Sequence, residues 1–142
     1  MPTLYIVATP IGNMADITRR ALETLSAVKL IAAEDTRKTR KLLTAYKIKT
    51  PMTSYYEHNK RLKLDYLLNL LEQDDVAVVS EAGTPGISDP GYELIVAASQ
   101  KGIPVVSVPG PSVVITALSV SALPTDRFTY MGFLPRRASE RR

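Results

Sequence analysis

The 142-residue chain contains no cysteine and only one histidine. Disulfides and thiolate metal ligands are therefore excluded, and a single histidine leaves too few nitrogen ligands for a typical zinc site. No run of apolar residues approaches the 18 needed to span a membrane, and the N-terminus lacks the basic and apolar segments of a signal peptide. We therefore expect a cytoplasmic protein with no metal site and no membrane partner.

The amino-acid composition is that of a soluble globular protein, with 45% hydrophobic and 23% charged residues. The net charge of +4 hides an uneven distribution, because residues 1–63 hold 12 Lys and Arg against 5 Asp and Glu, whereas residues 64–135 hold 2 against 8. The basic residues cluster within 37–49 and 60–63. This clustering indicates a phosphate-binding face, and the alternative is a solvated helix surface.

Short apolar segments alternate with amphipathic segments along the chain. We expect strands at 3–8, 30–33, 51–56, 76–80 and 104–108. The intervening helices are expected at about 17–28, 37–46, 60–71, 91–101 and 113–122, with N-caps at Asp16, Asn59, Asp89 and Ser112. The buried face of the third helix is expected to carry Leu62, Tyr66, Leu67, Leu70 and Leu71. This alternation predicts an α/β fold, a five-stranded, mainly parallel sheet with helices on both faces.

Three turns rich in glycine and proline follow strands, at residues 9–13, 81–91 and 109–112. The carboxyl ends of parallel strands meet at one edge of a sheet, so we expect the three turns to converge there and form a composite pocket. Gly83 and Gly86 would let a ligand lie directly against the backbone. The alternative is that these are ordinary connections between strands and helices.

The end of the chain suggests a second structural unit. The segment 128–135 is expected to form a strand, after which the sequence becomes rich in arginine. We therefore expect an N-terminal α/β domain over 1–124, and over 125–142 a linker with the first strand of a truncated second domain.

Six blocks identify a family resemblance: ATPIGNMADIT, AAEDTRKTRKLL, YEHN, EAGTPGISDPGYELI, VPGPSVVITALSVSALPTDRF and YMGFLP. Over residues 3–135 the chain resembles the N-terminal domain of the ribosomal small-subunit RNA (cytidine-2′-O)-methyltransferases, a branch of the tetrapyrrole methylase family. One position departs from the pattern, since Glu81 stands where the family usually has aspartate. The resemblance implies an S-adenosylmethionine site between two α/β domains, a homodimer, and small-subunit ribosomal RNA as the partner.

The resemblance also assigns roles to single residues. The positions that match the family's cofactor contacts are Pro10, Gly83, Thr84, Ile87, Ser112 and Val113. A GxGxxG pattern is absent, so we do not expect the glycine-rich turn to cradle a phosphate. For RNA binding we expect contributions from Arg37, Lys38, Arg40, Lys41, Lys60 and Arg61.

The implied reaction is transfer of a sulfonium methyl group to a ribose 2′-hydroxyl, which positioning and a general base would both accelerate. Candidate bases are Glu34, Asp35 and His58, although His58 also fits a surface or capping role. We select Asp35 and Arg37 as catalytic residues, with Arg37 as an alternative holder of an RNA phosphate.

Two other functions remain open on the sequence alone. One is a methylase of small tetrapyrroles such as cobalamin or siroheme precursors, and the other is a noncatalytic RNA-binding module. The EDTRKT and EHN blocks and the basic face favour RNA methylation. We expect the 142-residue chain by itself to be inactive.

Overall fold

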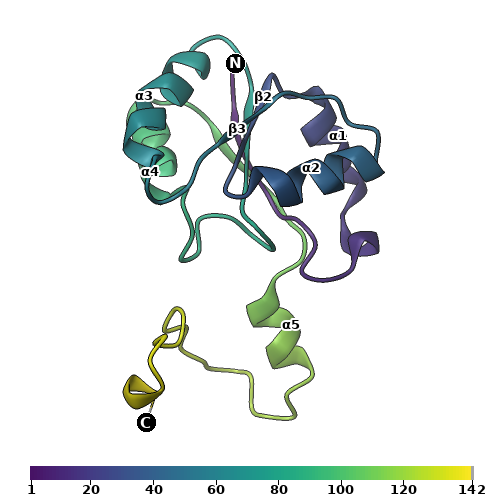
Figure 1. Cartoon of the computed structure of the whole chain (residues 1–142), viewed down its shortest axis with the longest axis vertical. Coiled ribbons are helices and arrows are strands. Elements are labelled where there is room, and N and C mark those ends of the chain that lie inside the picture. The colour runs from purple at the N-terminus through teal and green to yellow at the C-terminus, as the bar shows by residue number, and fades with distance from the viewer. Residues whose placement is uncertain (142) are drawn as a thin grey trace.

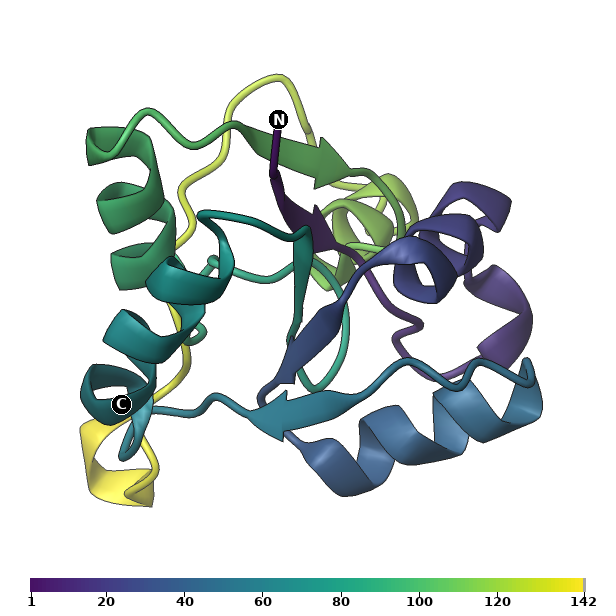
Figure 2. The ribbon, with the colours of Figure 1, turned by 90° about the horizontal axis from the view of Figure 1, so that it is seen from above.

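The computed structural model describes residues 1–141 and contains one five-stranded sheet between two helical layers (Figures 1 and 2). The strands are β1 (Leu4–Val7), β2 (Leu30–Ala33), β3 (Met52–Ser54), β4 (Val76–Val79) and β5 (Val105–Val108). The α-helices are α1 (Arg19–Ala27), α2 (Thr36–Ala45), α3 (Lys60–Leu70), α4 (Tyr92–Gln100) and α5 (Val113–Ser119). Two short 3-10 helices, η1 (Met14–Asp16) and η2 (Ala138–Glu140), complete the list.

The sheet has the order β3-β2-β4-β1-β5, and every strand pair is parallel. β1 and β4 are neighbours near the centre, with Leu4 opposite Val76 and Ile6 opposite Val78. The expected parallel sheet is confirmed. Because the strands run the same way, the turns that follow β1, β4 and β5 all leave from one edge.

The strands are buried on both faces, which explains why they read as continuous apolar runs. One face packs Leu4, Ile6, Val76 and Val78 against α3 and α4. The opposite face packs Val7, Ile31, Ala77 and Val79 against α1 and α2. Figure 2 shows these two helix pairs on opposite sides of the sheet, as the sequence predicted.

Two predicted helix caps are wrong by two residues. Asp16 belongs to η1, and α1 is capped by Thr18, whose hydroxyl accepts the Ala21 N–H at 3.0 Å. Similarly, α4 is capped by Gly91 and not by Asp89. Gly91 has a φ of 141°, a conformation that glycine adopts without a steric cost, and this leaves Asp89 outside the helix.

The buried face of α3 also differs from the prediction. Leu67 and Leu71 are buried as predicted, but Leu62 and Tyr66 are 84% and 50% exposed. Leu68, which was not predicted, is also buried against the sheet. Asn59 does occupy the N-cap position, but its side chain makes no capping bond and instead accepts the Tyr56 N–H at 2.8 Å. Leucines occur on more than one side of this helix, so periodicity alone did not identify the buried stripe.

The part of the chain after β5 lies away from the two helical layers. Figure 1 shows α5 beyond the carboxyl edge of the sheet and the segment after it turning back toward the loops at that edge. The strand expected at 128–135 is not formed, because residues 125–141 pair with no other strand among the described residues. No helix within 1–141 is both long and apolar enough to cross a membrane.

Candidate functional site

The turns after β1 and β4 are joined by two reciprocal backbone hydrogen bonds. Thr9 donates its N–H to the Gly83 carbonyl at 3.0 Å, and Gly83 donates its N–H to the Thr9 carbonyl at 3.0 Å. Gly83 has a φ of 80°, so this pairing uses a conformation that residues with a Cβ rarely adopt. A Cβ at Gly83 would also lie 3.4 Å from the Ile11 side chain. That distance is an ordinary van der Waals contact, so the positive φ and not a lack of space favours glycine at this position.

The turn after β5 joins the same assembly. The Thr84 hydroxyl donates to the Pro111 carbonyl at 3.3 Å, which ties the second turn to the third. Ser112 then begins α5 by accepting the Ile115 N–H. The three turns thus form one connected structure at the carboxyl edge of the sheet, as their positions after strands predicted.

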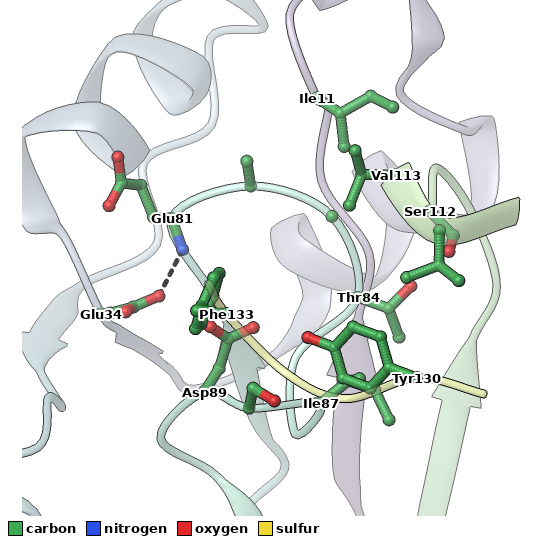
Figure 3. A pocket seen from close by; sticks show the side chains of 14 residues that line it. Ile11, Glu34, Glu81, Thr84, Ile87, Asp89, Ser112, Val113, Tyr130 and Phe133 are labelled. Carbon is green, nitrogen blue, oxygen red and sulfur yellow. Dashed lines mark hydrogen bonds between the residues drawn. The ribbon is translucent and has the colours of Figure 1, made fainter. Parts of the chain in front are cut away.

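These turns enclose a cavity of about 460 Å³ (Figure 3). Five of the six residues predicted to contact the cofactor line it: Gly83, Thr84, Ile87, Ser112 and Val113. The sixth, Pro10, lies instead in a smaller hollow on the other side of the first turn. The volume is within the range of about 300–1,000 Å³ typical of small-molecule pockets.

Two aromatic side chains complete the cavity wall from a distant part of the sequence. Tyr130 and Phe133 approach from the coil after α5, and Figure 3 shows both beside the turn that carries Ile87. Sequence reasoning missed them because segment 128–135 was expected to be a strand of another domain. The signal that was available is the presence of apolar aromatic residues in a segment with no helical periodicity.

Three carboxylates, Glu34, Glu81 and Asp89, line one side of the cavity. Glu34 accepts the backbone N–H of Glu81 at 2.7 Å, and the Glu81 carboxylate pairs with Lys38. Asp89 has no hydrogen-bond or ion-pair partner among residues 1–141. Burial raises the pKa of Asp89 to about 6, and the negative charges of Glu34 and Glu81 act in the same direction.

The two residues selected as catalytic lie outside this cavity. Asp35 is the N-cap of α2 and accepts the N–H groups of Arg37 and Lys38 at 2.9 and 3.1 Å. The bond from the Lys38 N–H lowers the pKa of Asp35, which makes its carboxylate a weaker base. The Arg37 side chain is 92% exposed, and His58 is exposed in the turn before α3.

The residues predicted to bind RNA divide into two groups. Arg37, Lys38, Arg40 and Lys41 are exposed along α2, while Thr39, Leu42 and Leu43 form its buried side. Lys60 is largely buried and pairs with Glu57 and Glu93, so its charge is already balanced. Arg61 is exposed on α3. The exposed basic surface thus lies mainly on α2, at the end that adjoins the carboxylates.

No group of three or more His, Cys, Asp or Glu side chains within 1–141 is arranged to hold a metal ion. The three carboxylates of the cavity, with one lysine partner between them, leave an excess of negative charge on this wall. Such a wall disfavours a phosphate group and favours a ligand that carries positive charge.

Comparison with known structures shows the same fold in two solved proteins. Uroporphyrin-III-C-methyltransferase from Thermus thermophilus superposes with a TM-score of 0.64 at 24% identity, over 87% of this chain and 53% of that one. A putative diphthine synthase from Entamoeba histolytica superposes with a TM-score of 0.66 at 21% identity, over 92% of this chain and 49% of that one.

Closer relatives carry the name "Ribosomal RNA small subunit methyltransferase I". The protein of that name from Escherichia coli O157:H7 is 54% identical over 140 residues, and the one from Halalkalibacterium halodurans is 52% identical over 141 residues. The matches cover 98% and 99% of this chain but 49% of each relative, so the chain spans about half their length. The family model for tetrapyrrole (corrin/porphyrin) methylases matches residues 3–141. The chain therefore belongs to the tetrapyrrole methylase family.

Proposed function

We propose that this chain is the methyl-donor-binding part of an enzyme that methylates the 2′-hydroxyl of a cytidine in small-subunit ribosomal RNA. The observation that carries the proposal is the joining of three turns around one cavity, which five of the six positions of the family's cofactor contacts line. The names of relatives at about 50% identity support RNA as the substrate. Ribosomal RNA as substrate would place the enzyme in the cytoplasm.

The residues of the cavity fit S-adenosylmethionine, which when bound supplies a methyl group on a positively charged sulfur. Ile11, Ile87 and Val113 provide apolar cover, and the Gly83 backbone can be approached closely because no Cβ is present. The carboxylates Glu34 and Asp89 give the wall a negative charge that stabilises a cationic ligand. These features support the cofactor assignment.

The position of the carboxylates also bears on the proton that the ribose hydroxyl must lose. Glu34 and Asp89 line the cavity, whereas Asp35 is held in the cap of α2. A base has to lie within hydrogen-bonding reach of the proton that it accepts. We therefore assign the proton acceptor to the pair Glu34 and Asp89 in place of Asp35.

The exposed basic side of α2 is suited to hold the RNA backbone. Arg40 and Lys41 make no ion pair within residues 1–141, and the Arg37 guanidinium, 4.0 Å from the Asp35 carboxylate, remains 92% exposed. Contacts from such cations to phosphates supply much of the affinity for nucleic acid. Arg37 can hold a phosphate through two parallel hydrogen bonds. We propose the small ribosomal subunit as the partner and a homodimer as the assembly, both from the family resemblance.

The proposal is tested with a variant that fills the cavity. Ala82 is exposed and lines the cavity, so Ala82→Phe should leave the fold intact and weaken S-adenosylmethionine binding at least about tenfold, which corresponds to about 1.4 kcal/mol. The matched control is Ala45→Phe, which makes the same change at an exposed position on α2. Calorimetry on the chain measures affinity, and methyl incorporation into small subunits by the longer enzyme measures activity. Equal affinity in Ala82→Phe and wild type would contradict the assignment.

A further inference from the structure

An open hollow of about 380 Å³ lies beside the cavity formed by the three turns, on the side of β2 and β3. Ser54 and Tyr56 line it from the end of β3, and Arg37 lines it from the start of α2. Glu34 and Glu81 line both spaces, so the hollow and the cavity adjoin at these two carboxylates. Figure 3 shows both on the side of the cavity away from the start of α5. A substrate strand in this hollow would therefore pass the edge of the cavity.

Tyr56 contributes an aromatic ring to the hollow. The residue is 41% exposed and belongs to neither of the two core clusters. The His58 ring packs against it edge to face, with ring centroids 6.2 Å apart and an interplanar angle of 73°. Because Tyr56 is still exposed beside His58, part of its surface is free to contact a planar ligand.

The backbone that carries this ring is fixed by hydrogen bonds. The Asn59 side chain accepts the Tyr56 N–H at 2.8 Å, and the Tyr56 carbonyl accepts the N–H groups of Asn59 and Lys60 at 3.0 Å each. The Asn59 amide also donates to the carbonyl and the hydroxyl of Ser54 at 3.2 and 3.0 Å. Asn59 therefore uses its side chain to hold this turn and not to cap α3. A group that is already held in place loses less conformational entropy on binding than a mobile one.

The charges around the hollow indicate which part of a nucleic-acid strand enters it. Glu34 and Asp35 make part of its lining negative, which repels a phosphate and can accept the amino group of a base. Arg37 is 92% exposed, so its guanidinium can hold a phosphate that stays in solvent. An aromatic side chain next to an exposed cation is a combination that single-stranded nucleic-acid sites use.

From these observations we infer that Tyr56 stacks against one unstacked base of the RNA substrate, while Arg37 holds an adjacent phosphate. This inference rests on the proposed function, since it requires an RNA substrate. Stacking would fix the position of the strand beside the cavity without reading the identity of the base, because every base has a π-face. Tyr56 is thus a positioning residue, and binding of the methyl donor does not depend on it.

The inference is tested with a short single-stranded oligoribonucleotide that carries 2-aminopurine, a base whose fluorescence falls when it stacks on an aromatic ring. The wild-type chain should bind this strand and quench its fluorescence. Tyr56→Leu keeps an apolar side chain but removes the ring, so it should weaken binding at least about fivefold and abolish the added quenching. Tyr56→Phe keeps the ring and should retain both. Both variants should fold, because Tyr56 lies outside the core clusters.

The salt dependence of binding separates stacking from charge attraction. Tyr56→Leu should lower the affinity equally at every salt concentration, with the slope of log affinity against log salt unchanged. Arg37→Ala should reduce that slope by about 0.7, the change expected for one phosphate contact on a single strand. The matched control is Tyr66→Leu, which makes the same change at a 50% exposed position on α3 outside the hollow and should leave binding and quenching unchanged.

Three outcomes would overturn the inference: equal losses in Tyr56→Leu and Tyr66→Leu, wild-type binding by Tyr56→Leu, or a wild-type chain that does not bind and quench the strand. Calorimetry with S-adenosylmethionine keeps the two proposals apart, because Tyr56→Leu should bind the donor with wild-type affinity. Absence of donor binding in the wild-type chain would contradict the proposed function, whereas absence of quenching would contradict only the role of Tyr56.

Discussion

Asp89 shows how the position of a single carboxylate relative to a helix end changes its chemistry. At the N-cap of α4 it would accept backbone N–H groups and its pKa would fall. Gly91 takes that position instead, and Asp89 is left without a hydrogen-bond partner beside Glu34 and Glu81. The Asp89-Pro90 pair correctly predicted that a helix starts nearby. The helix begins two residues later than predicted, so Asp89 lines the cavity and does not cap α4.

This environment predicts a pH dependence of stability. Burial raises the pKa of Asp89 from 3.8 to about 6, so the folded protein retains a proton that the unfolded chain has already released. The free energy of unfolding should therefore fall as the pH rises from about 4 to about 6. Asp89→Asn removes this dependence and should be more stable than wild type at pH 7.5, with no advantage below pH 4.

Urea unfolding at several pH values measures the effect. Asp126→Asn is the control, because Asp126 is exposed in the coil after α5. A destabilised Asp89→Asn variant at pH 7.5 would mean that the charged carboxylate has a stabilising partner. This would contradict the raised pKa that burial, Glu34 and Glu81 give Asp89.

At the scale of elements, α2 depends on Asp35 for its first turn. Asp35→Ala should lower the free energy of unfolding by about 1 kcal/mol, because two backbone N–H groups lose their acceptor. The pKa of Asp35 is lowered in the folded protein, so this stabilisation is present above about pH 4 and is lost as the pH falls below the usual value of 3.8.

Asp35→Asn is the informative partner variant, since asparagine also caps helices well. It should retain most of the stability by urea unfolding. If the longer enzyme also retains its methyl transfer activity with Asp35→Asn, the residue acts as a cap. A large loss of activity with unchanged stability would instead restore Asp35 as the base.

The sequence predicted the strands and helices better than it predicted which residues cap the helices or lie on their buried faces. The five strands were predictable because buried parallel strands are short, apolar and followed by glycine or proline, as in Val76–Val79 before the turn at 81–91. The buried stripe of α3 was predictable only in part: Leu67 is buried as expected, but the exposure of Leu62 and the burial of Leu68 depend on which side the sheet lies. The place of Tyr130 in the cavity depends on how a coil folds back, for which the sequence has no periodic signal.

At the scale of the whole molecule, the segment after β5 exposes much apolar surface. Val113, Val120, Leu123, Phe133 and Leu134 are all more than 60% exposed. Large exposed apolar side chains on a soluble protein often mark a surface that another chain covers. We expect the chain to self-associate through this segment.

Sedimentation velocity over a range of protein concentrations tests this expectation. The double variant Val120→Lys and Leu123→Lys should shift the population toward monomer without changing the unfolding midpoint, because neither side chain is part of the core. Leu62→Lys is the control, since Leu62 is equally exposed but lies on α3. A monomeric wild type, or an equal effect of the control, would contradict the expectation.

The hydrogen bonds between the three turns also determine the route by which a ligand can enter and leave. The walls that contain Gly83 and Thr84 are tied to Thr9 and Pro111, so opening them would break bonds continuous with the sheet. The wall that contains Tyr130 and Phe133 is different, because no backbone N–H of residues 125–135 donates to another backbone group within the described chain. Segments with few such bonds open at the lowest free energy. A ligand of the cavity should therefore enter and leave past these two aromatic rings.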